Sequence, residues 1–175
     1  MRISDSARPP ARISGFPPIE NPSARILILG SMPGEASLRA GQYYAHPQNL
    51  FWRILGEIHG TARDAPYADR LRMLKANGIA LWDVLASCVR EGSLDSDIVA
   101  GSLHANDFAA FFAAHRKIER VLFNGTKAEA CFLKHVAPSM AERKIRYLRL
   151  PSTSPANASI AYARKIADWR DALAK

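Results

Sequence analysis

Cysteine and long apolar runs are both scarce in this sequence, and each shortage excludes a class of protein. Only two of the 175 residues are cysteines, Cys88 and Cys131, and neither belongs to a Cys-x-x-Cys motif. A disulfide scaffold, a four-cysteine zinc site and a four-cysteine iron–sulfur cluster are therefore excluded. The apolar runs are much shorter than the ~18 residues of a membrane-spanning helix, and residues 1–10 lack the apolar centre of a signal peptide. We therefore expect no membrane partner.

Several cofactor and catalytic fingerprints are also missing. The sequence contains neither the Gly-x-Gly-x-x-Gly motif of dinucleotide-binding proteins nor a phosphate loop ending in Gly-Lys-Ser/Thr. The Gly-x-Ser-x-Gly motif of serine esterases is absent as well. The five histidines show no metal-ligand spacing with carboxylates or thiols. We therefore expect an activity that needs neither a cofactor nor a metal.

Positive charge is in excess, and it is unevenly spread. The formal net charge is +8, and an excess of this size suggests a polyanionic partner, most often nucleic acid. Residues 1–115 hold 11 basic and 11 acidic side chains, whereas residues 116–175 hold 13 basic and 5 acidic ones. The whole excess therefore lies in the last third of the chain.

The chain divides into a leader, residues 1–24, and one domain, residues 25–175. Five prolines in the leader disfavour a helix or a central strand, so we expect it to be irregular. In the domain, short apolar runs alternate with helical patterns. Strands are predicted at 25–30, 79–83, 120–124 and 145–150, and helices at 50–59, 67–76, 106–115, 126–137 and 157–174.

This alternation predicts an α/β fold, a three-layer α/β/α sandwich around a four-stranded parallel sheet. The run at 145–150 alternates apolar and basic residues, so we place that strand near an edge. Ligands of open parallel sheets bind beyond the carboxyl ends of the strands. Function is therefore expected in the segments that follow the strands, which are 30–49, 83–98, 124–127 and 151–157.

The segment after the first strand is the most informative one. Gly30-Ser-Met-Pro-Gly34 is a tight turn that can aim backbone N–H groups at an anion, although a turn without chemistry is an equal alternative. Gln42-Tyr-Tyr-Ala-His-Pro-Gln-Asn-Leu-Phe-Trp52 follows, and a loop so rich in rings and amides can wall a pocket for a planar heterocycle. The alternative for Phe51 or Trp52 is a place in the core.

Together these two motifs closely resemble the hypoxanthine-DNA glycosylase branch of the uracil-DNA glycosylase superfamily, also called DNA-deoxyinosine glycosylases. The resemblance continues in matching order at 80–85, 88–98, 123–128 and 150–157. It implies a three-layer fold with a central four-stranded parallel sheet. It also implies an enzyme that flips a damaged base into a pocket, hydrolyses the N-glycosidic bond and leaves an abasic site.

The sequence departs from many superfamily members at two positions. Met32 stands where many carry an Asp or Asn that handles the attacking water, and Leu150 stands where many carry a His. The hypoxanthine branch is similar to this sequence at both points. There the resemblance implies that the amide of the His-Pro-x-Asn segment is catalytic, which assigns that role to Asn49.

The resemblance and the residue types together give a candidate site. We expect Asn49 to orient the water, with Ser31 as the second catalytic candidate. We expect Asp83 to form hydrogen bonds with the base; the alternative for Asp83 is that it caps the next turn. Arg90 is expected to be structural, paired with Asp95 or Asp97. The expected base pocket comprises Gly30, Met32, Pro33, Gly34, Tyr43, Tyr44, His46, Phe51, Asp83 and Ser87.

DNA contacts are expected from the third and fourth segments and the basic residues near them. Lys127 opens a helix, where phosphates bind readily, and Asn124 is expected to fix the turn before it. The other expected contacts are Pro151, Ser152, Thr153, Ser154, Pro155, Asn157, Arg149 and Arg164, with Arg143, Lys144, Arg146 and Lys165 as further candidates.

The sequence thus predicts a monofunctional DNA-deoxyinosine glycosylase that acts as a monomer on double-stranded DNA containing a deaminated base. We expect it in the cytoplasm, at the nucleoid in a bacterium. Two alternatives are open: a broader uracil and xanthine glycosylase, or an inactive DNA-binding module of the same fold.

Overall fold

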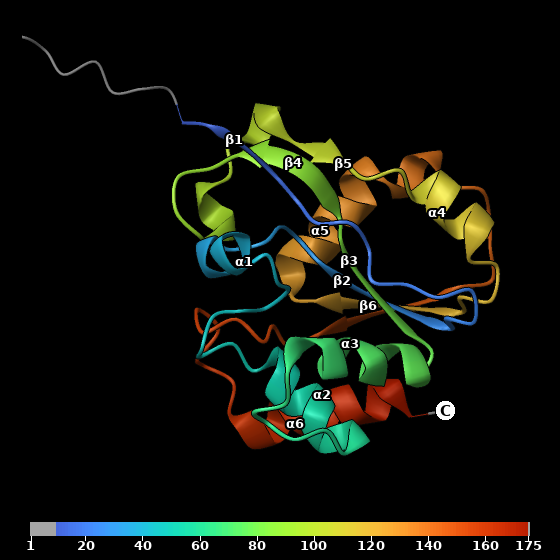
Figure 1. Cartoon of the computed structure of the whole chain (residues 1–175). Helices are drawn as coiled ribbons and strands as arrows, with labels where there is room; N and C mark the ends of the chain where they lie inside the picture. Colours follow the sequence, from blue (N-terminus) through green and yellow to red (C-terminus); the bar gives the residue numbers. More distant parts are fainter. Residues whose placement is uncertain (1–9, 175) are drawn as a thin grey trace, which may run out of the picture.

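The computed structural model describes residues 10–174, which form a parallel sheet between two layers of helices (Figure 1). The strands are β2 (Ile26–Gly30), β3 (Ile79–Asp83), β6 (Arg120–Asn124) and β7 (Arg146–Leu150), in the order β3-β2-β6-β7. All three pairs are parallel. The predicted fold class and the four predicted strands are confirmed, and β7 lies at an edge as expected.

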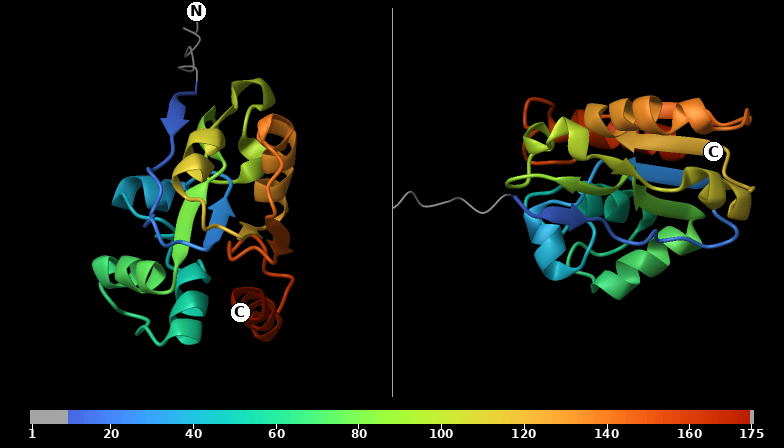
Figure 2. Two further views of the ribbon diagram at one scale, coloured as in Figure 1. Left: turned by 90° about the vertical axis from the view of Figure 1, so that its right-hand side faces the viewer. Right: turned by 90° about the horizontal axis from the view of Figure 1, so that it is seen from above.

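Alternate residues of the central strands face opposite helical layers. Ile26 and Ile28 of β2 pack against α2 (Phe51–His59), α3 (Tyr67–Ala76) and α6 (Tyr162–Leu173), which lie together below the sheet in the left view of Figure 2. Leu27 and Leu29 face α4 (Phe108–Ala114) and α5 (Thr126–His135). Both faces of β2 are therefore buried, which explains its continuous apolar sequence.

A second, antiparallel sheet was not predicted. It consists of β1 (Arg12–Ser14), β4 (Leu85–Val89) and β5 (His104–Ala105), in the order β1-β4-β5. Only Val84 separates β4 from β3, and no Gly, Pro or Asn marks a turn between the two strands in the sequence. The short helix α1 (Glu35–Ala40) was missed as well, and it ends at Gly41 in a left-handed conformation with φ 63°.

The proline-rich leader is less irregular than predicted. Residues 12–14 form β1, which pairs with β4, and the buried Ile19 forms a bridge with Leu81. This is compatible with the prolines because Pro10 and Pro17 lie outside the three-residue ladder. Residues 1–9 of the predicted leader lie outside the described residues.

Helix ends follow the predicted signals in part. Asp107 caps α4 by accepting a hydrogen bond from the Ala110 backbone N–H at 3.0 Å, one of the two predicted caps. The last helix begins at Tyr162 rather than at 157 or 159, so the loop before it is longer than predicted. Among the described residues, no helix has the length and apolar character that crossing a bilayer would require.

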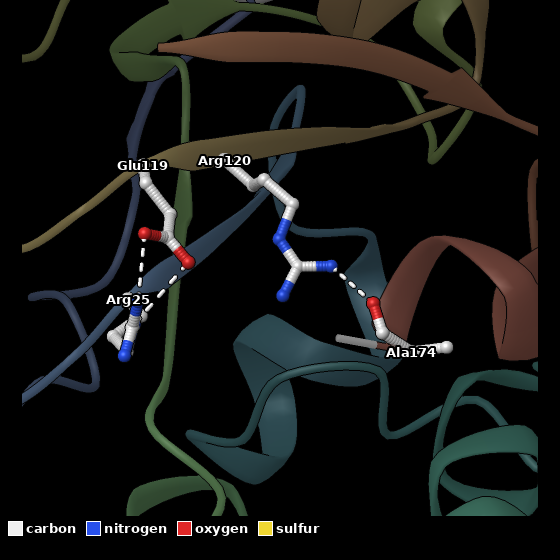
Figure 3. A network of polar contacts seen from close by, with 4 residues as sticks. All are labelled: Arg25, Glu119, Arg120 and Ala174. Carbon is white, nitrogen blue, oxygen red and sulfur yellow. Dashed lines mark hydrogen bonds and ion pairs between the residues drawn. The ribbon is translucent and has the colours of Figure 1, made fainter. Parts of the chain in front are cut away.

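Basic side chains tie elements together at the amino ends of the strands. Figure 3 shows Arg25 paired with Glu119 at 2.9 Å, which joins the segments that enter β2 and β6. In the same view, Arg120 donates a 2.7 Å hydrogen bond to the Ala174 carbonyl oxygen at the end of α6, and it also reaches the Ala172 oxygen at 2.8 Å. Helix C-terminal carbonyls lack partners within the helix and attract cations. These charges therefore stabilise the fold at the edge opposite the carboxyl ends of the sheet.

Trp169 links the core to the loop that follows β7. Its side chain is fully buried, it meets the Phe51 ring edge-on at 5.9 Å, and its indole N–H donates to the Pro151 carbonyl oxygen at 3.0 Å. We expect Trp169→Ala to lower the free energy of unfolding by about 3–5 kcal/mol in urea titrations. Trp169→Phe, which keeps an aromatic ring and loses the hydrogen bond, should cost about 1–2 kcal/mol. Equal losses in the two variants would contradict this account.

Candidate active site

A cavity of about 720 Å³ lies at the carboxyl edge of the parallel sheet. This is the size of a site that encloses a small organic ligand. Its walls come from all four segments that follow the strands, as the sequence predicts for open parallel sheets. The predicted site residues that it brings together are Gly30, Ser31, Met32, Pro33, Gly34, Tyr43, Tyr44, His46, Asn49, Asp83, Ser152, Thr153, Ser154, Pro155 and Asn157.

Asp83 and Tyr44 form a buried polar wall of the cavity around Gly30. Asp83 Oδ2 and Tyr44 Oη are both buried, and neither has a hydrogen-bond partner among the described residues. A Cβ atom at position 30 would lie 2.4 Å from Asp83 Oδ1 and 2.9 Å from Tyr44 Oη, so only glycine fits there. Buried polar atoms in native proteins are almost always paired. These two therefore point to a ligand that brings the missing partners.

The protonation of this wall is set by burial. Burial, with the charge of Asp95, raises the pKa of Asp83 to about 7, against a smaller lowering by Arg90. Burial and the charge of Asp83 also raise the pKa of Tyr44 above its usual range. At neutral pH, Tyr44 is therefore a neutral hydroxyl donor, and Asp83 is present in both its acid and its carboxylate forms.

Tyr44 is held in place by the aromatic residues behind it. Its backbone has a left-handed φ of 52°, uncommon for a residue with a Cβ, and its ring stacks on Phe51 at a centroid distance of 4.1 Å. Phe51 is fully buried and does not line the cavity. The prediction that Phe51 belongs to the base pocket is wrong, and the alternative place in the core is confirmed.

Met32 lines the cavity and also belongs to the apolar core. The side chain is 7% exposed and packs within the apolar cluster on the α4 and α5 side of the sheet. Position 32 therefore supplies packing in this chain, and the polar chemistry of the cavity has to come from other residues.

Ser31 is oriented by a carboxylate that sequence reasoning did not assign to the site. Ser31 Oγ donates a 2.6 Å hydrogen bond to Asp95 Oδ1, and Asp95 lines the cavity from the turn η1 (Asp95–Asp97). Arg90 is buried and structural, as expected, but it donates to the carbonyl oxygens of Pro33 at 2.5 Å and Gly92 at 2.9 Å. It therefore fixes both loops through carbonyl oxygens rather than through an ion pair. Sequence reasoning took Asp95 only as a partner for Arg90 and so missed its contact with Ser31.

The side-chain amide of Asn49 uses its oxygen in a hydrogen bond within the protein. Its Oδ1 accepts a 3.0 Å hydrogen bond from the Phe51 backbone N–H, which leaves the Nδ2 group to donate into the cavity. His46 Nδ1 accepts from the Gln48 backbone N–H at 3.1 Å, so the neutral ring carries its proton on Nε2. Both side chains thus present N–H donors, and neither is arranged as a base.

Asn124 fixes the loop 151–157 against the end of β6. Its Oδ1 accepts from the Thr153 backbone N–H and its Nδ2 donates to Thr153 Oγ1, both at 2.9 Å. The Thr153 carbonyl oxygen accepts a 3.0 Å bond from the Leu50 backbone N–H, which joins this loop to the ring-rich one (Figure 1). Asn124 has the turn-fixing contacts expected of it, and it also lines the cavity.

Lys165 supports the same loop from α6. It is 1% exposed and donates a 2.6 Å hydrogen bond to the Asn157 carbonyl oxygen. The prediction that Lys165 contacts phosphate is therefore wrong, because its ammonium group binds a backbone carbonyl oxygen inside the protein.

Other predicted residues lie away from the cavity. Ser87 is on β4, where it accepts a 3.0 Å bond from Arg12. Pro151, Arg149 and Arg164 line a separate groove of about 1200 Å³ beside β7 and α6. Arg149 pairs with Glu129 of α5, and Arg164 pairs with Asp168, which also lines the groove.

Three further basic residues lie at the wrong end of the sheet for the predicted DNA contacts. Arg143, Lys144 and Arg146 precede or begin β7 and so lie near the amino ends of the strands. Arg143 donates a 2.6 Å bond to the Phe112 carbonyl oxygen. Lys127, by contrast, lies close enough to the cavity that its charge lowers the pKa of Asp95, against the larger raising effect of burial.

The described part of the chain holds no cluster of three His, Cys, Asp or Glu side chains arranged for a metal ion. The polar side chains of the cavity are hydroxyls, amides, one imidazole and three carboxyls, of which Asp83 is buried, Asp95 is half-buried and Glu35 is exposed. Such a set binds a neutral polar ring through donors and acceptors.

Comparison with known proteins agrees with this geometry. A family model for the uracil DNA glycosylase superfamily matches residues 17–173. The hypoxanthine DNA glycosylase of Methanosarcina acetivorans is 38% identical over 156 residues, 89% of this chain and 94% of that protein. The hypoxanthine DNA glycosylase of Methanosarcina barkeri is 44% identical over 115 residues, 65% of this chain and 72% of that protein.

A solved structure shows the same fold. It is the solution NMR structure of a candidate uracil DNA glycosylase from Methanosarcina acetivorans, which superposes with a TM-score of 0.78 at 34% identity. The match covers 93% of this chain and 97% of that one. This chain therefore belongs to the uracil-DNA glycosylase superfamily.

Proposed function

We propose that this protein is a monofunctional DNA glycosylase that removes hypoxanthine from deoxyinosine in DNA. The observation that carries the proposal is the wall of unpartnered polar atoms formed by Tyr44 and Asp83 around Gly30. The relatives named hypoxanthine DNA glycosylase support it. The partner we propose is double-stranded DNA that holds a deaminated base, bound by a monomer in the compartment that holds the cell's DNA.

The wall fits the edge of a 6-oxopurine. Hypoxanthine presents an acceptor, the 6-oxo oxygen, beside a donor, the N1–H group. The hydroxyl of Tyr44 donates to the oxygen, and the carboxyl of Asp83 accepts from N1–H as the anion or donates to the oxygen as the acid. Pairing both buried atoms repays the cost of leaving them unpaired in the free enzyme.

The chemistry we propose is hydrolysis at C1′ of the flipped nucleotide. Water attacks C1′ while the bond to N9 of the base breaks, and the sugar develops oxocarbenium character. The Nδ2 group of Asn49 orients the water, and Ser31, oriented by Asp95, lies at the same wall. Donors near the departing base are worth about 3 kcal/mol each when they meet developing negative charge.

The enzyme leaves an abasic site and goes no further. Cleavage of the sugar would need an amine to form a Schiff base with C1′. Among the described residues that line the cavity there is no lysine. Lys127 lies in the first turn of α5, outside the lining, and is proposed to meet phosphate, whereas the ammonium group of Lys165 is bonded to the Asn157 carbonyl oxygen.

A second candidate function follows from the same wall. Uracil and xanthine also present an oxo oxygen beside a ring N–H, so a broader glycosylase would use Tyr44 and Asp83 in the same way. Adenine and cytosine present the reverse order, an exocyclic amine beside a ring acceptor. Substrate competition among deoxyinosine, deoxyxanthosine and deoxyuridine duplexes ranks the three deaminated bases.

The proposed activity is tested with a labelled duplex that contains one deoxyinosine, incubated in EDTA and then treated with hot alkali. We expect strand cleavage at the lesion only after alkali, because the product is an abasic site. Asn49→Ala should slow the single-turnover rate by roughly 10²-fold or more, since it loses the proposed water-orienting group. Gln48→Ala, at the exposed neighbouring position, is the matched control. An uncut lesion in deoxyinosine, uracil and xanthine duplexes alike would refute the glycosylase proposal.

The buried carboxyl of Asp83 predicts how stability depends on pH. Its pKa is about 7 in the folded protein against a normal 3.8, so folding takes up a proton between these values. The free energy of unfolding therefore falls as the pH rises from about 4 to 7, and above 7 the folded chain carries the buried charge. Asp83→Asn should be more stable than the wild type at pH 8 by roughly 1–4 kcal/mol and equal to it near pH 4 in urea titrations.

The control for this pH effect is Asp64→Asn, which removes an exposed carboxyl. Its stability should run parallel to that of the wild type across the whole range. A difference between Asp83→Asn and the wild type that is the same at pH 4 and pH 8 would contradict the assignment.

The proposed phosphate contact of Lys127 predicts a change in salt dependence. Lys127 and Lys134 lie at opposite ends of α5, and only Lys127 is at the end near the cavity. Lys127→Gln should reduce the slope of log affinity against log salt by about 1, because one phosphate contact is lost. Lys134→Gln should leave the slope unchanged. Fluorescence anisotropy with a lesion duplex at several salt concentrations measures both, and equal slopes for the two variants would remove Lys127 from the DNA interface.

A further inference from the structure

The two edges of the parallel sheet differ in how they are covered. Beyond β3, the leader adds an antiparallel bridge, in which Ile19 and Leu81 exchange two backbone hydrogen bonds of 2.8 Å. At the other edge, β7 pairs only with β6 in the described part of the chain. An uncovered edge strand presents unpaired backbone groups, which another extended chain can bind.

The backbone groups that β7 leaves free belong to Tyr147 and Arg149. The N–H of Arg146 and the carbonyl oxygen of Leu150 both form hydrogen bonds on the β6 side, at 2.8 and 3.1 Å. Backbone groups of successive residues in a strand point to opposite sides. Those of Tyr147 and Arg149 therefore point away from the sheet, and no hydrogen bond within residues 10–174 uses them.

One face of this edge carries exposed apolar side chains. Tyr147 is 43% exposed although its ring packs against Phe132 of α5 at 5.6 Å, and Leu133 is 57% exposed. α5 runs back along β7, and Arg149 pairs with Glu129, one helical turn before Leu133. Four helix residues and two strand residues both span about 6 Å, so Leu133 lies at the level of Tyr147. An edge that is only protected against aggregation carries charges rather than two exposed apolar side chains.

The other face of the edge is basic. It borders the groove of about 1200 Å³ beside β7 and α6, which six basic and three acidic side chains line. The residues drawn in Figure 3, Arg120 among them, belong to this lining. Arg120 and Arg146 are paired positions on β6 and β7, so two like charges stand side by side and repel each other. Because Arg146 is exposed, an anionic group can reach it and relieve that repulsion.

We propose that an extended, acidic segment of a partner protein binds along the outer edge of β7 as a further strand. The free backbone groups of Tyr147 and Arg149 supply the pairing, which is how sheet edges bind peptides. Successive side chains of a strand face opposite sides, so the bound segment alternates in character. Its apolar residues pack on Tyr147 and Leu133, and its acidic residues face Arg146 and the groove.

The features of this edge favour such a segment over two other occupants. Duplex DNA has charge of the right sign, but it brings no strand to the backbone groups and no packing partner to the apolar side chains. A second copy of this chain, joined edge to edge, would set two basic edges against each other. The groove and the active-site cavity share no lining residue, so binding at this edge does not depend on the proposed cleavage.

The first test uses two fluorescein-labelled peptides of equal composition and charge. One alternates, Glu-Val-Asp-Ile-Glu-Val-Asp-Ile, and the other separates the two kinds of residue, Glu-Asp-Glu-Asp-Val-Ile-Val-Ile. In anisotropy titrations with the whole protein, the alternating peptide should bind at least about tenfold more tightly, because it alone presents one acidic and one apolar side.

Variants of the protein then assign the binding to the edge. Arg146→Glu and Leu133→Ser should each weaken binding of the alternating peptide by about tenfold, since each removes one of its two kinds of contact. Arg63→Glu and Val99→Ser are the matched controls, because they make the same kinds of change at exposed positions outside the groove. Both controls should bind the peptide as the wild type does.

The second test locates the peptide on the backbone by amide hydrogen exchange. The amides of Tyr147 and Arg149 should exchange fast in the free protein, and saturation with the alternating peptide should slow both by about tenfold or more. The amides of Arg146 and Leu148 bond toward β6 in the free protein already, so they are the internal control and should change little.

Several results would overturn this binding site. Equal binding of the two peptides would do so, as would no binding of either, or binding that leaves the amides of Tyr147 and Arg149 unprotected. Lesion-free duplex DNA that binds in place of the peptide, and more weakly to Arg146→Glu, would assign the groove to nucleic acid. A dimer in sedimentation that Leu133→Ser dissociates would assign the edge to a second copy of the chain.

Discussion

The active-site cavity depends on an unfavourable contact, the burial of the Asp83 carboxyl and the Tyr44 hydroxyl around Gly30. Glycine is required at position 30 because a Cβ atom there would collide with both oxygens. The folded chain accepts a carboxyl whose pKa is raised to about 7 and two polar atoms without partners. Structures tolerate such costs where the surrounding packing holds the groups in place and a ligand relieves them. A ligand that pairs with these two oxygens would remove this cost, which is the physical basis of the base-binding role proposed for them.

On the other side of the cavity, rigid elements hold the loop 151–157 through hydrogen bonds from their side chains. Asn124 at the end of β6 fixes Thr153, and Lys165 and Trp169 of α6 fix Asn157 and Pro151. Each of these side chains bonds to the backbone of the loop 151–157, so this rim of the cavity is held by β6 and α6. Preorganised donors need no rearrangement during the reaction, which is what an electrostatic site requires.

The sequence predicts the parts of the protein that follow local patterns. β2 and β6 were predictable because strands buried on both faces are continuous apolar runs, and the cavity segments followed from the ends of those strands. β4 was not predictable, since one residue separates it from β3 and no turn residue marks the boundary. The predictions that Phe51 lines the base pocket and that Lys165 contacts phosphate failed for the same reason. Residue type indicates what a side chain is able to contact, whereas its direction depends on tertiary packing. The bond between Ser31 and Asp95, 64 positions apart in sequence, has no local signal.

The direction of each basic side chain also decides how much of the positive charge is free to contact DNA. The excess of basic residues lies beyond residue 115, yet several of them act within the protein, with Arg120 capping α6, Arg143 binding a carbonyl oxygen and Lys165 buried under a loop. Arg149 and Arg164 line a groove apart from the cavity, and each is paired with a carboxylate. The charge free to meet phosphate is therefore smaller than the formal count. A glycosylase that relied on net charge would bind all DNA alike, whereas one that relies on the wall of Tyr44 and Asp83 gains affinity only where a base can be extruded and can pair with it.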